Sequence, residues 1–175
     1  RAMLCFCAWQ FSTVSANSTA QPDKITAAAT AAAGEQPFAL YEGLVRELRA
    51  GGYVLYMRHG PTAPGSTDRR GPGAWWLDCQ RTQTLAGDAR LAADNVAGAL
   101  TKQRIPVTEV LTSEFCRTFE TGTQLGLVAP VRTAALNDPV TLPTAASSGF
   151  LEGIRELLSR PAQAKSNRIL VGHLL

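Results

Sequence analysis

The chain has 175 residues, of which 45% are hydrophobic and 18% charged, and its formal net charge is +3. This length corresponds to one domain, and the hydrophobic content excludes disorder over most of the chain. No apolar run approaches the roughly 20 residues that a membrane-spanning helix needs, so no integral membrane segment is expected. The weak positive charge comes without a basic stripe, and we therefore expect no nucleic-acid partner.

The beginning of the chain differs in composition from the rest. Residues 1–16 combine one arginine, a short apolar run and a small-x-small ending, a pattern typical of the remnant of a signal peptide. The alternative is a frayed apolar tail. An exported protein, periplasmic or secreted, is expected in the first case and a cytoplasmic one in the second. Residues 17–37 are Ala-rich and predict a linker, because small side chains bury too little surface to form a core.

Residues 38–175 should form the folded domain, in which helices and strands alternate. In chain order, the hydrophobic spacing predicts a helix over 38–48 closed by Gly51-Gly52, a strand over 53–57, a helix over 85–100 that ends before Pro106, a strand over 110–112, a helix over 151–158 that ends at Pro161, and a strand over 169–171. Because the chain stops just after this last strand-like run, we also expect C-terminal truncation.

The strands are nearly continuous apolar runs, which favours a sheet that is covered on both faces. Long stretches with helical spacing separate them, as parallel crossovers require. The sequence therefore predicts an α/β fold with a mainly parallel sheet. Residues 61–76 and 129–149 are rich in Gly, Pro, Ala, Thr and Ser, and we expect loops there. Long loops in compact domains are usually functional, so substrate specificity is expected in them.

Polar side chains follow each predicted strand. Arg58-His59-Gly60-Pro61-Thr62 comes after the first, Ser113 to Thr118 after the second, and Gly172-His173 after the third. His59 and His173 are the two histidines of the chain. Ligands of parallel sheets bind beyond the carboxyl ends of the strands, so these groups should meet there.

Two arginines and two histidines in one place suit a phosphate ester. The planar fork of arginine binds phosphate oxygens in pairs, and a histidine is partly neutral near pH 7, so it can act as a nucleophile. Gly60 would let the backbone approach the ligand. The sequence has no spaced Cys/His set and no Asp-rich loop, so no metal and no other cofactor is expected.

These three segments resemble the motifs of the histidine phosphatase superfamily, which includes the phosphoglycerate mutases. Arg58-His59-Gly60-Pro61-Thr62 matches the Arg-His-Gly-x-Thr hallmark, Ser113 with Arg117-Thr118-Phe119-Glu120-Thr121 matches the second motif, and Leu170-Val171-Gly172-His173 matches the third. The resemblance covers Tyr53 to His173 and implies a three-layer α/β/α sandwich of the phosphoglycerate mutase type.

The resemblance implies a role for each matched residue. His59 would attack phosphorus and become phosphohistidine, while Arg58, Arg117 and His173 would hold the phosphoryl oxygens. Thr62 would form a hydrogen bond in the same phosphate-binding pocket. The expected activity is metal-independent hydrolysis of a small phosphorylated substrate or a phosphoprotein. A mutase-type phosphoryl transferase and a non-catalytic phosphate-binding domain are the alternatives.

The resemblance also calls for a carboxylic acid that protonates the leaving oxygen. Asp138 and Glu152 are the candidates, and we favour Asp138, whose alternative role is that of a turn residue before Pro139. Leu174 follows His173 where the phytase-like branch has an Asp, which argues against that branch.

Four other features have a functional and a structural interpretation. In an exported protein, Cys79 and Cys116 could form a disulfide, or they could be buried thiols. Trp75-Trp76 could stack on a substrate or plug the core. Arg69-Arg70 and Arg81 could bind a second anionic group or lie on a solvated surface.

Overall fold

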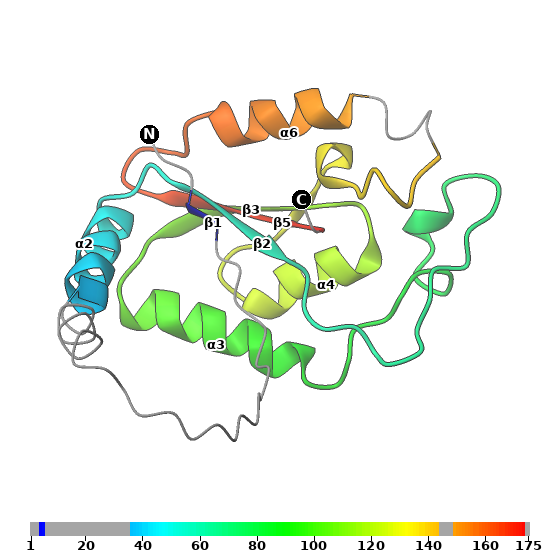
Figure 1. Cartoon of the computed structure of the whole chain (residues 1–175), viewed down its shortest axis with the longest axis horizontal. Helices are drawn as coiled ribbons and strands as arrows, with labels where there is room; N and C mark the ends of the chain where they lie inside the picture. Colours follow the sequence, from blue (N-terminus) through cyan, green and yellow to red (C-terminus); the bar gives the residue numbers. More distant parts are fainter. Residues whose placement is uncertain (1–3, 6–35, 144–148, 174–175) are drawn as a thin grey trace, which may run out of the picture.

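The computed structural model describes residues 4–5, 36–143 and 149–173, and Figure 1 shows one central sheet with helices on both sides. Its elements in chain order are β1 (Leu4–Cys5), α2 (Gln36–Ala50), β2 (Val54–Arg58), η1 (Trp75–Leu77), α3 (Ala89–Lys102), β3 (Val107–Thr112), α4 (Cys116–Leu125), β4 (Val131–Arg132), η2 (Ala134–Leu136), α6 (Phe150–Ser159) and β5 (Asn167–Gly172). The η elements are short 3-10 turns. No helix in the described ranges is long and apolar enough to cross a membrane.

The sheet has the strand order β1-β2-β5-β3-β4, and all its described pairs are parallel. β5 lies in the middle and is buried along its whole length. Ile169 of β5 is in register with Leu55 of β2 on one side and with Val110 of β3 on the other. This register brings the carboxyl ends of the three central strands to one edge of the sheet.

The alternation of side chains along these strands produces two cores. On one face, Leu55, Val110 and Ile169 pack with residues of three helices: Leu48 of α2, Ala93 of α3 and Leu125 of α4. On the other face, Tyr56, Leu111 and Leu170 pack with Leu136 of η2 and Ile154 of α6. Figure 1 shows the same layers, with α6 on one side of the sheet and α3 and α4 on the other. The predicted three-layer α/β/α sandwich is confirmed.

Most predicted elements are present, and some bounds are corrected. The three predicted strands correspond to β2, β3 and β5; β2 is shifted by one residue, and β3 and β5 are longer than expected. The helix predicted from residue 85 begins only at Ala89, because Leu85 forms an isolated antiparallel bridge with Thr62. The predicted loop over 129–149 contains β4 and η2. The leader and linker predictions fall almost wholly outside the described residues, apart from β1 and the start of α2, and they stay predictions.

A close contact between β2 and β5 holds the end of the central strand in place. The hydroxyl of Tyr56 donates a hydrogen bond to the carbonyl oxygen of His173 over 2.5 Å. A β-carbon at Gly172 would overlap this hydroxyl and would lie 2.9 Å from Tyr56 Cζ. Glycine is therefore required at position 172 for steric reasons, directly before a predicted site residue.

Replacing Gly172 by alanine should lower the free energy of unfolding by about 1–3 kcal/mol, the usual cost of overpacking a core. Urea unfolding of Gly172→Ala measures this. Gly98→Ala is the matched control, because nothing lies within 4 Å of a β-carbon there and alanine is the better helix former in α3. An unchanged urea midpoint for Gly172→Ala would refute the steric argument.

Candidate active site

The candidate site lies where β2, β5 and β3 end. The main-chain hydrogen bonds of the sheet continue past the strands: His59 N–H donates to Gly172 O over 3.1 Å, and Ser113 N–H donates to Val171 O over 3.1 Å. These bonds fix the first residues after each strand. The sheet therefore positions the backbones of His59, Ser113 and His173 next to one another, as the motif order predicts.

Arg117 reaches the same place from the first turn of α4. Its guanidinium is buried, with 3% of the side chain exposed, and Cζ lies 4.5 Å from the centre of the Phe115 ring. Nε donates to Nε2 of His59 over 3.3 Å, and NH2 lies 3.3 Å from Nδ1 of His173. One edge of the guanidinium thus contacts both histidines. Sequence analysis predicts this grouping, and the structure brings the three side chains together.

The hydrogen bonds fix the tautomer of His59. Nδ1 lies 2.8 Å from the carbonyl oxygen of Gly60, which can only accept, so Nδ1 carries the proton. Nε2 is then unprotonated, and its lone pair accepts the hydrogen bond from Arg117 Nε. Burial, with the charges of Arg117 and Arg58 as smaller causes, lowers the pKa of His59 to about 4, against the opposing effect of the hydrogen bond to Gly60. His59 is therefore a neutral imidazole at pH 7.

His173 has the opposite tautomer. Its Nδ1 faces a guanidinium nitrogen, which can only donate, so Nε2 carries the proton and donates to Ser113 Oγ over 2.9 Å. Ser113 Oγ in turn lies 2.6 Å from Thr118 Oγ1, which donates to Phe115 O. Burial lowers the pKa of His173 to about 2, with the charges of Arg117, His59 and Arg58 as smaller causes.

Both histidines should therefore stay neutral from pH 8 down to about 5. His59 and His173 are the only histidines of the chain, so their imidazole nitrogens can be followed by NMR without assignment ambiguity. We expect His59 to titrate near pH 4 and His173 below it. A titration near 6.5 for either ring would contradict the burial argument.

The same shifts determine how stability depends on pH. Each histidine has a lower pKa when folded than its usual value of 6.5, so the unfolded chain binds more protons below that pH. This contribution to stability is complete above pH 6.5 and is lost as the pH falls toward 4. A urea midpoint that decreases over this range is the expected result.

The structure places the remaining predicted residues around this centre. Arg58 is exposed at the end of β2 and is close enough to affect the pKa of both histidines. Gly60 N–H donates to Thr121 Oγ1, which donates to Arg117 O, so the backbone after His59 is tied to α4. Thr62 pairs with Leu85 at the base of the loop, and the structure gives it no contact with Arg117 or the histidines.

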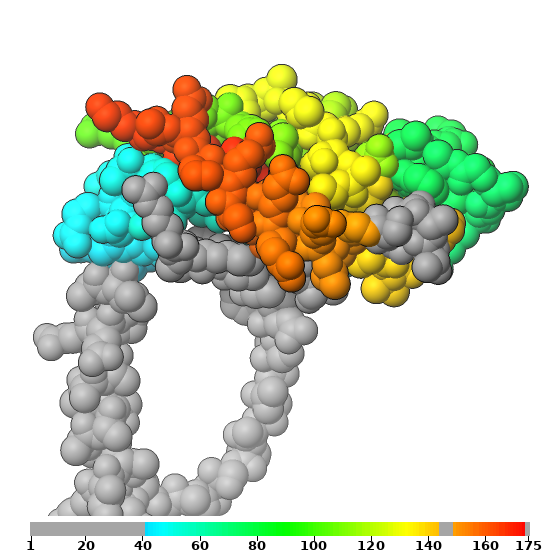
Figure 2. All heavy atoms as spheres, turned by 90° about the horizontal axis from the view of Figure 1, so that it is seen from above, coloured from blue at the N-terminus to red at the C-terminus, as the bar shows by residue number. Residues whose placement is uncertain are grey.

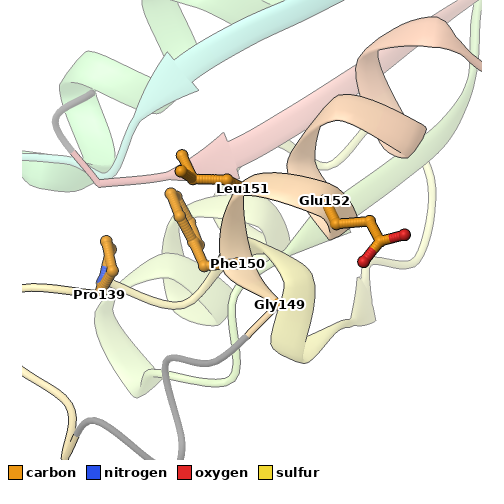
Figure 3. A pocket seen from close by; sticks show the side chains of 5 residues that line it. All are labelled: Pro139, Gly149, Phe150, Leu151 and Glu152. Atoms are coloured by element: carbon orange, nitrogen blue, oxygen red, sulfur yellow. The ribbon is translucent and has the colours of Figure 1, made fainter.

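The two proton-donor candidates differ in position. Asp138 is half-buried just after η2 and accepts a hydrogen bond from Val140 N–H. Burial lowers the pKa of Arg117, and Asp138 lies close enough for its charge to oppose part of that lowering. Glu152 is exposed in the first turn of α6. Figure 3 shows it at the rim of a surface depression, pointing away from Pro139. The arrangement favours Asp138, which also forms the turn that its alternative interpretation predicts.

Sequence reasoning missed Asp68, which lies in the predicted functional loop. Its Oδ1 accepts from Arg117 NH1 over 3.1 Å and from Gln83 N–H over 2.8 Å. The two side chains of this ion pair are 3% and 8% exposed. The available signal in the sequence was an acidic residue in a loop rich in Gly and Pro. This signal does not indicate that Arg117 is the partner of Asp68. In the described residues, no group of three or more His, Cys, Asp or Glu side chains could hold a metal ion.

Trp75 and Trp76 fasten the same loop to the second motif. Trp75 is 2% exposed and packs edge-on against Phe115, with ring centres 5.8 Å apart. Trp76 donates from its indole nitrogen to Glu114. Phe115 packs edge-on against His173, with ring centres 4.9 Å apart. Trp75 therefore acts as a core plug behind the site, the structural one of its two interpretations.

A disulfide joins Cys79 of the loop to Cys116 at the start of α4, with 5.5 Å between the two Cα atoms. Cys116 directly precedes Arg117. The cross-link therefore holds the loop against the helix end that carries the guanidinium. Cys79 is exposed and Cys116 is buried.

Removal of this disulfide should destabilise the fold. The two cysteines are 37 residues apart. Closing a loop of that size lowers the entropy of the unfolded chain, which raises the free energy of unfolding by about 4 kcal/mol. We expect a lower urea midpoint for Cys79→Ser/Cys116→Ser and for the parent chain in reductant. The double variant itself should not respond to reductant, and a parent that does not respond either would contradict the prediction.

Comparisons with known proteins gave structural matches only. No family model matches the chain, and no curated protein matches it. The structure is similar to that of a proposed phosphohistidine phosphatase SixA from Nakamurella multipartitia, at 25% identity and a TM-score of 0.42. The match covers 67% of this chain and 56% of that one.

Two further matches have comparable statistics. The protein histidine phosphatase SixA complexed with tungstate matches at 20% identity and a TM-score of 0.43 over 69% of each chain. A mycobacterial glucosyl-3-phosphoglycerate phosphatase matches at 21% identity and a TM-score of 0.40, over 67% of this chain and 72% of that one.

The three motifs of the chain resemble those of the histidine phosphatase superfamily in sequence and in order. Each directly follows a central strand, and the fold brings His59, Arg117 and His173 into contact. The structure thus gathers the residues that carry the resemblance in one place.

Proposed function

We propose that the chain hydrolyses phosphomonoesters through a phosphohistidine formed at Nε2 of His59. The observation that carries the proposal is the guanidinium edge of Arg117, whose Nε and NH2 each lie 3.3 Å from one histidine nitrogen. A phosphoryl group entering between the rings would meet both donors of that edge and the lone pair of His59.

The first chemical step follows from this arrangement. Nε2 of His59 attacks phosphorus, the N–P bond forms and the bond from phosphorus to the ester oxygen breaks. The proton stays on Nδ1 and keeps its hydrogen bond to the carbonyl oxygen of Gly60. This hydrogen bond stabilises the positive charge that develops on the ring. Arg117 and Arg58 stabilise the charge on the phosphoryl oxygens in the transition state. His173 accepts from Arg117 NH2 through Nδ1 and so holds the guanidinium edge toward these oxygens.

The second step regenerates the free enzyme. Water attacks phosphorus of the phosphohistidine, the N–P bond breaks, and inorganic phosphate leaves. We propose that Asp138 protonates the departing ester oxygen in the first step and takes a proton from water in the second. Its proximity to Arg117 supports this role, whereas Glu152 lies exposed on α6.

The charges of the site suit a small phosphorylated substrate or a phosphorylated side chain. A phosphomonoester carries about −1.5 to −2 charges at pH 7. Arg58 and Arg117 provide positive charge for that group without a metal ion, so the proposed reaction needs no cofactor. Arg69 and Arg81 are occupied within the loop: Arg69 donates to Gln80 O, and Arg81 donates to Arg69 O.

The proposal predicts that His59→Ala abolishes release of phosphate from an aryl phosphate in the presence of a chelator. Arg117→Ala should lower kcat/KM by about 10²–10³-fold, as loss of an oxyanion donor does. Arg90→Ala is the matched control, because Arg90 pairs with Asp94 on the exposed side of α3 and should leave turnover unchanged.

Four results would contradict the proposal. Turnover by His59→Ala would exclude the phosphohistidine. Turnover lost with chelator would indicate metal-dependent hydrolysis. A folded chain that binds vanadate without turnover would support the non-catalytic phosphate-binding alternative. Transfer of phosphate to a second acceptor, rather than to water, would indicate a mutase.

We further propose that the protein is exported, as the pattern over residues 1–16 suggests. The Cys79–Cys116 disulfide supports this, since disulfides persist mainly in oxidising compartments. Alkylation of the chain in its own cells, before lysis, should leave Cys79 and Cys116 unmodified. Modification of both thiols would place the protein in a reducing compartment.

A further inference from the structure

The ion pair at the centre of the site joins Arg117 of the second motif to Asp68, which lies outside the three motifs. Arg117 presents Nε and NH2 along one edge of its guanidinium, and these two nitrogens face the histidines. The remaining nitrogen, NH1, faces Asp68. The carboxylate therefore binds the nitrogen that is not directed at the phosphoryl position.

This division of donors leaves the phosphate-binding edge available. A guanidinium is a rigid plane, so a bond to NH1 fixes the direction of Nε and NH2 as well. The contacts to the histidines are weaker than the contact to Asp68, because they join nitrogen to neutral imidazole at 3.3 Å. Asp68 is thus the stronger of the partners that orient Arg117.

Asp68 is itself held in place by both sides of the loop. The oxygen that accepts from Arg117 also accepts from Gln83 N–H over 2.8 Å. Gln83 Nε2 donates to Ser66 O, and Thr84 N–H donates to Ser66 Oγ. These bonds join residues 66–68 to residues 83–84, so the carboxylate belongs to a closed hydrogen-bonded loop.

We propose that Asp68 is a positioning residue that sets the orientation of Arg117 for phosphoryl transfer. This inference rests on the proposed phosphatase function. Asp68 is distinct from the proposed proton donor Asp138, because its Oδ1 is occupied by Arg117 NH1 and by Gln83 N–H. Its negative charge also opposes the substrate's phosphate, so its benefit comes from geometry.

Two substitutions separate geometry from charge. Asp68 accepts from Arg117 NH1 and from Gln83 N–H through Oδ1, and the carbonyl oxygen of Asn can accept the same two bonds, so Asp68→Asn removes only the charge. Asp68→Ala removes both the charge and the acceptor. Asp78→Ala is the matched control from the same loop, because Asp78 is exposed and its side chain accepts a local hydrogen bond from Gln80 N–H.

We expect Asp68→Ala to lower kcat by about 100-fold, the usual loss for a misplaced catalytic group. Asp68→Asn should stay within about tenfold of the wild-type kcat, because a neutral acceptor gives a bond roughly half as strong. Its KM should fall, because a charge that repels the substrate is gone. Asp78→Ala should behave like the wild-type protein.

The leaving group provides the second readout. A positioning role predicts that Asp68→Ala loses the same factor with phenyl phosphate as with 4-nitrophenyl phosphate. A proton donor would lose more with phenyl phosphate, whose oxygen leaves less readily. Wild-type kcat in Asp68→Ala, equal losses in both Asp68 variants, or a loss that depends on the leaving group would each overturn the inference.

The experiment keeps the inference separate from the proposed function. If wild-type protein has no turnover, the proposed function fails, and the inference that rests on it is overturned with it. If wild-type protein turns over and His59→Ala does not, the Asp68 comparison tests positioning alone. Thermal unfolding identifies a variant that does not fold, and in that case Asp68→Asn alone decides, through its kcat and KM.

Discussion

The burial of one guanidinium organises this molecule. Arg117 lies between two neutral histidines and one carboxylate, and 3% of its side chain is exposed. A buried arginine without partners is costly, so the residues around it must be placed with precision. The sheet supplies two of them at the ends of β2 and β5, α4 supplies the guanidinium, and the loop supplies Asp68. The low pKa values of His59 and His173 result from the same burial and the same positive charge.

The order of the sheet explains why residues far apart in sequence meet here. β5 follows every other described strand in the sequence and lies between β2 and β3 in space. Each of these three strands ends in a chemical motif, so their register becomes the geometry of the site. The close contact between Tyr56 and Gly172, with the hydrogen bond from Tyr56 to His173 O, maintains this register at the residue before His173.

The sequence pattern was sufficient for the sheet and for the three motifs, because continuous apolar runs and strand-exit residues are local signals. It was insufficient for α4, whose buried face consists largely of small and polar residues such as Thr118, Thr121 and Gly122. A hydrophobic pattern does not reveal such a helix. It was also insufficient for Asp68, which lies 49 residues from Arg117. A long-range ion pair of this kind depends on the path of the loop, which has no periodic signal.

The central place of β5 has a consequence for biosynthesis. While the chain is being made, β2 and β3 emerge before the strand that separates them, and each must wait with an unpaired edge. Insertion of β5 then forms the sheet and delivers His173 in a single event. Until that moment the nascent chain has Arg117 and His59 but not the second histidine, so the three side chains of the site come together only when β5 has been inserted. A ribosome that pauses before residue 167 would present an inactive, aggregation-prone intermediate.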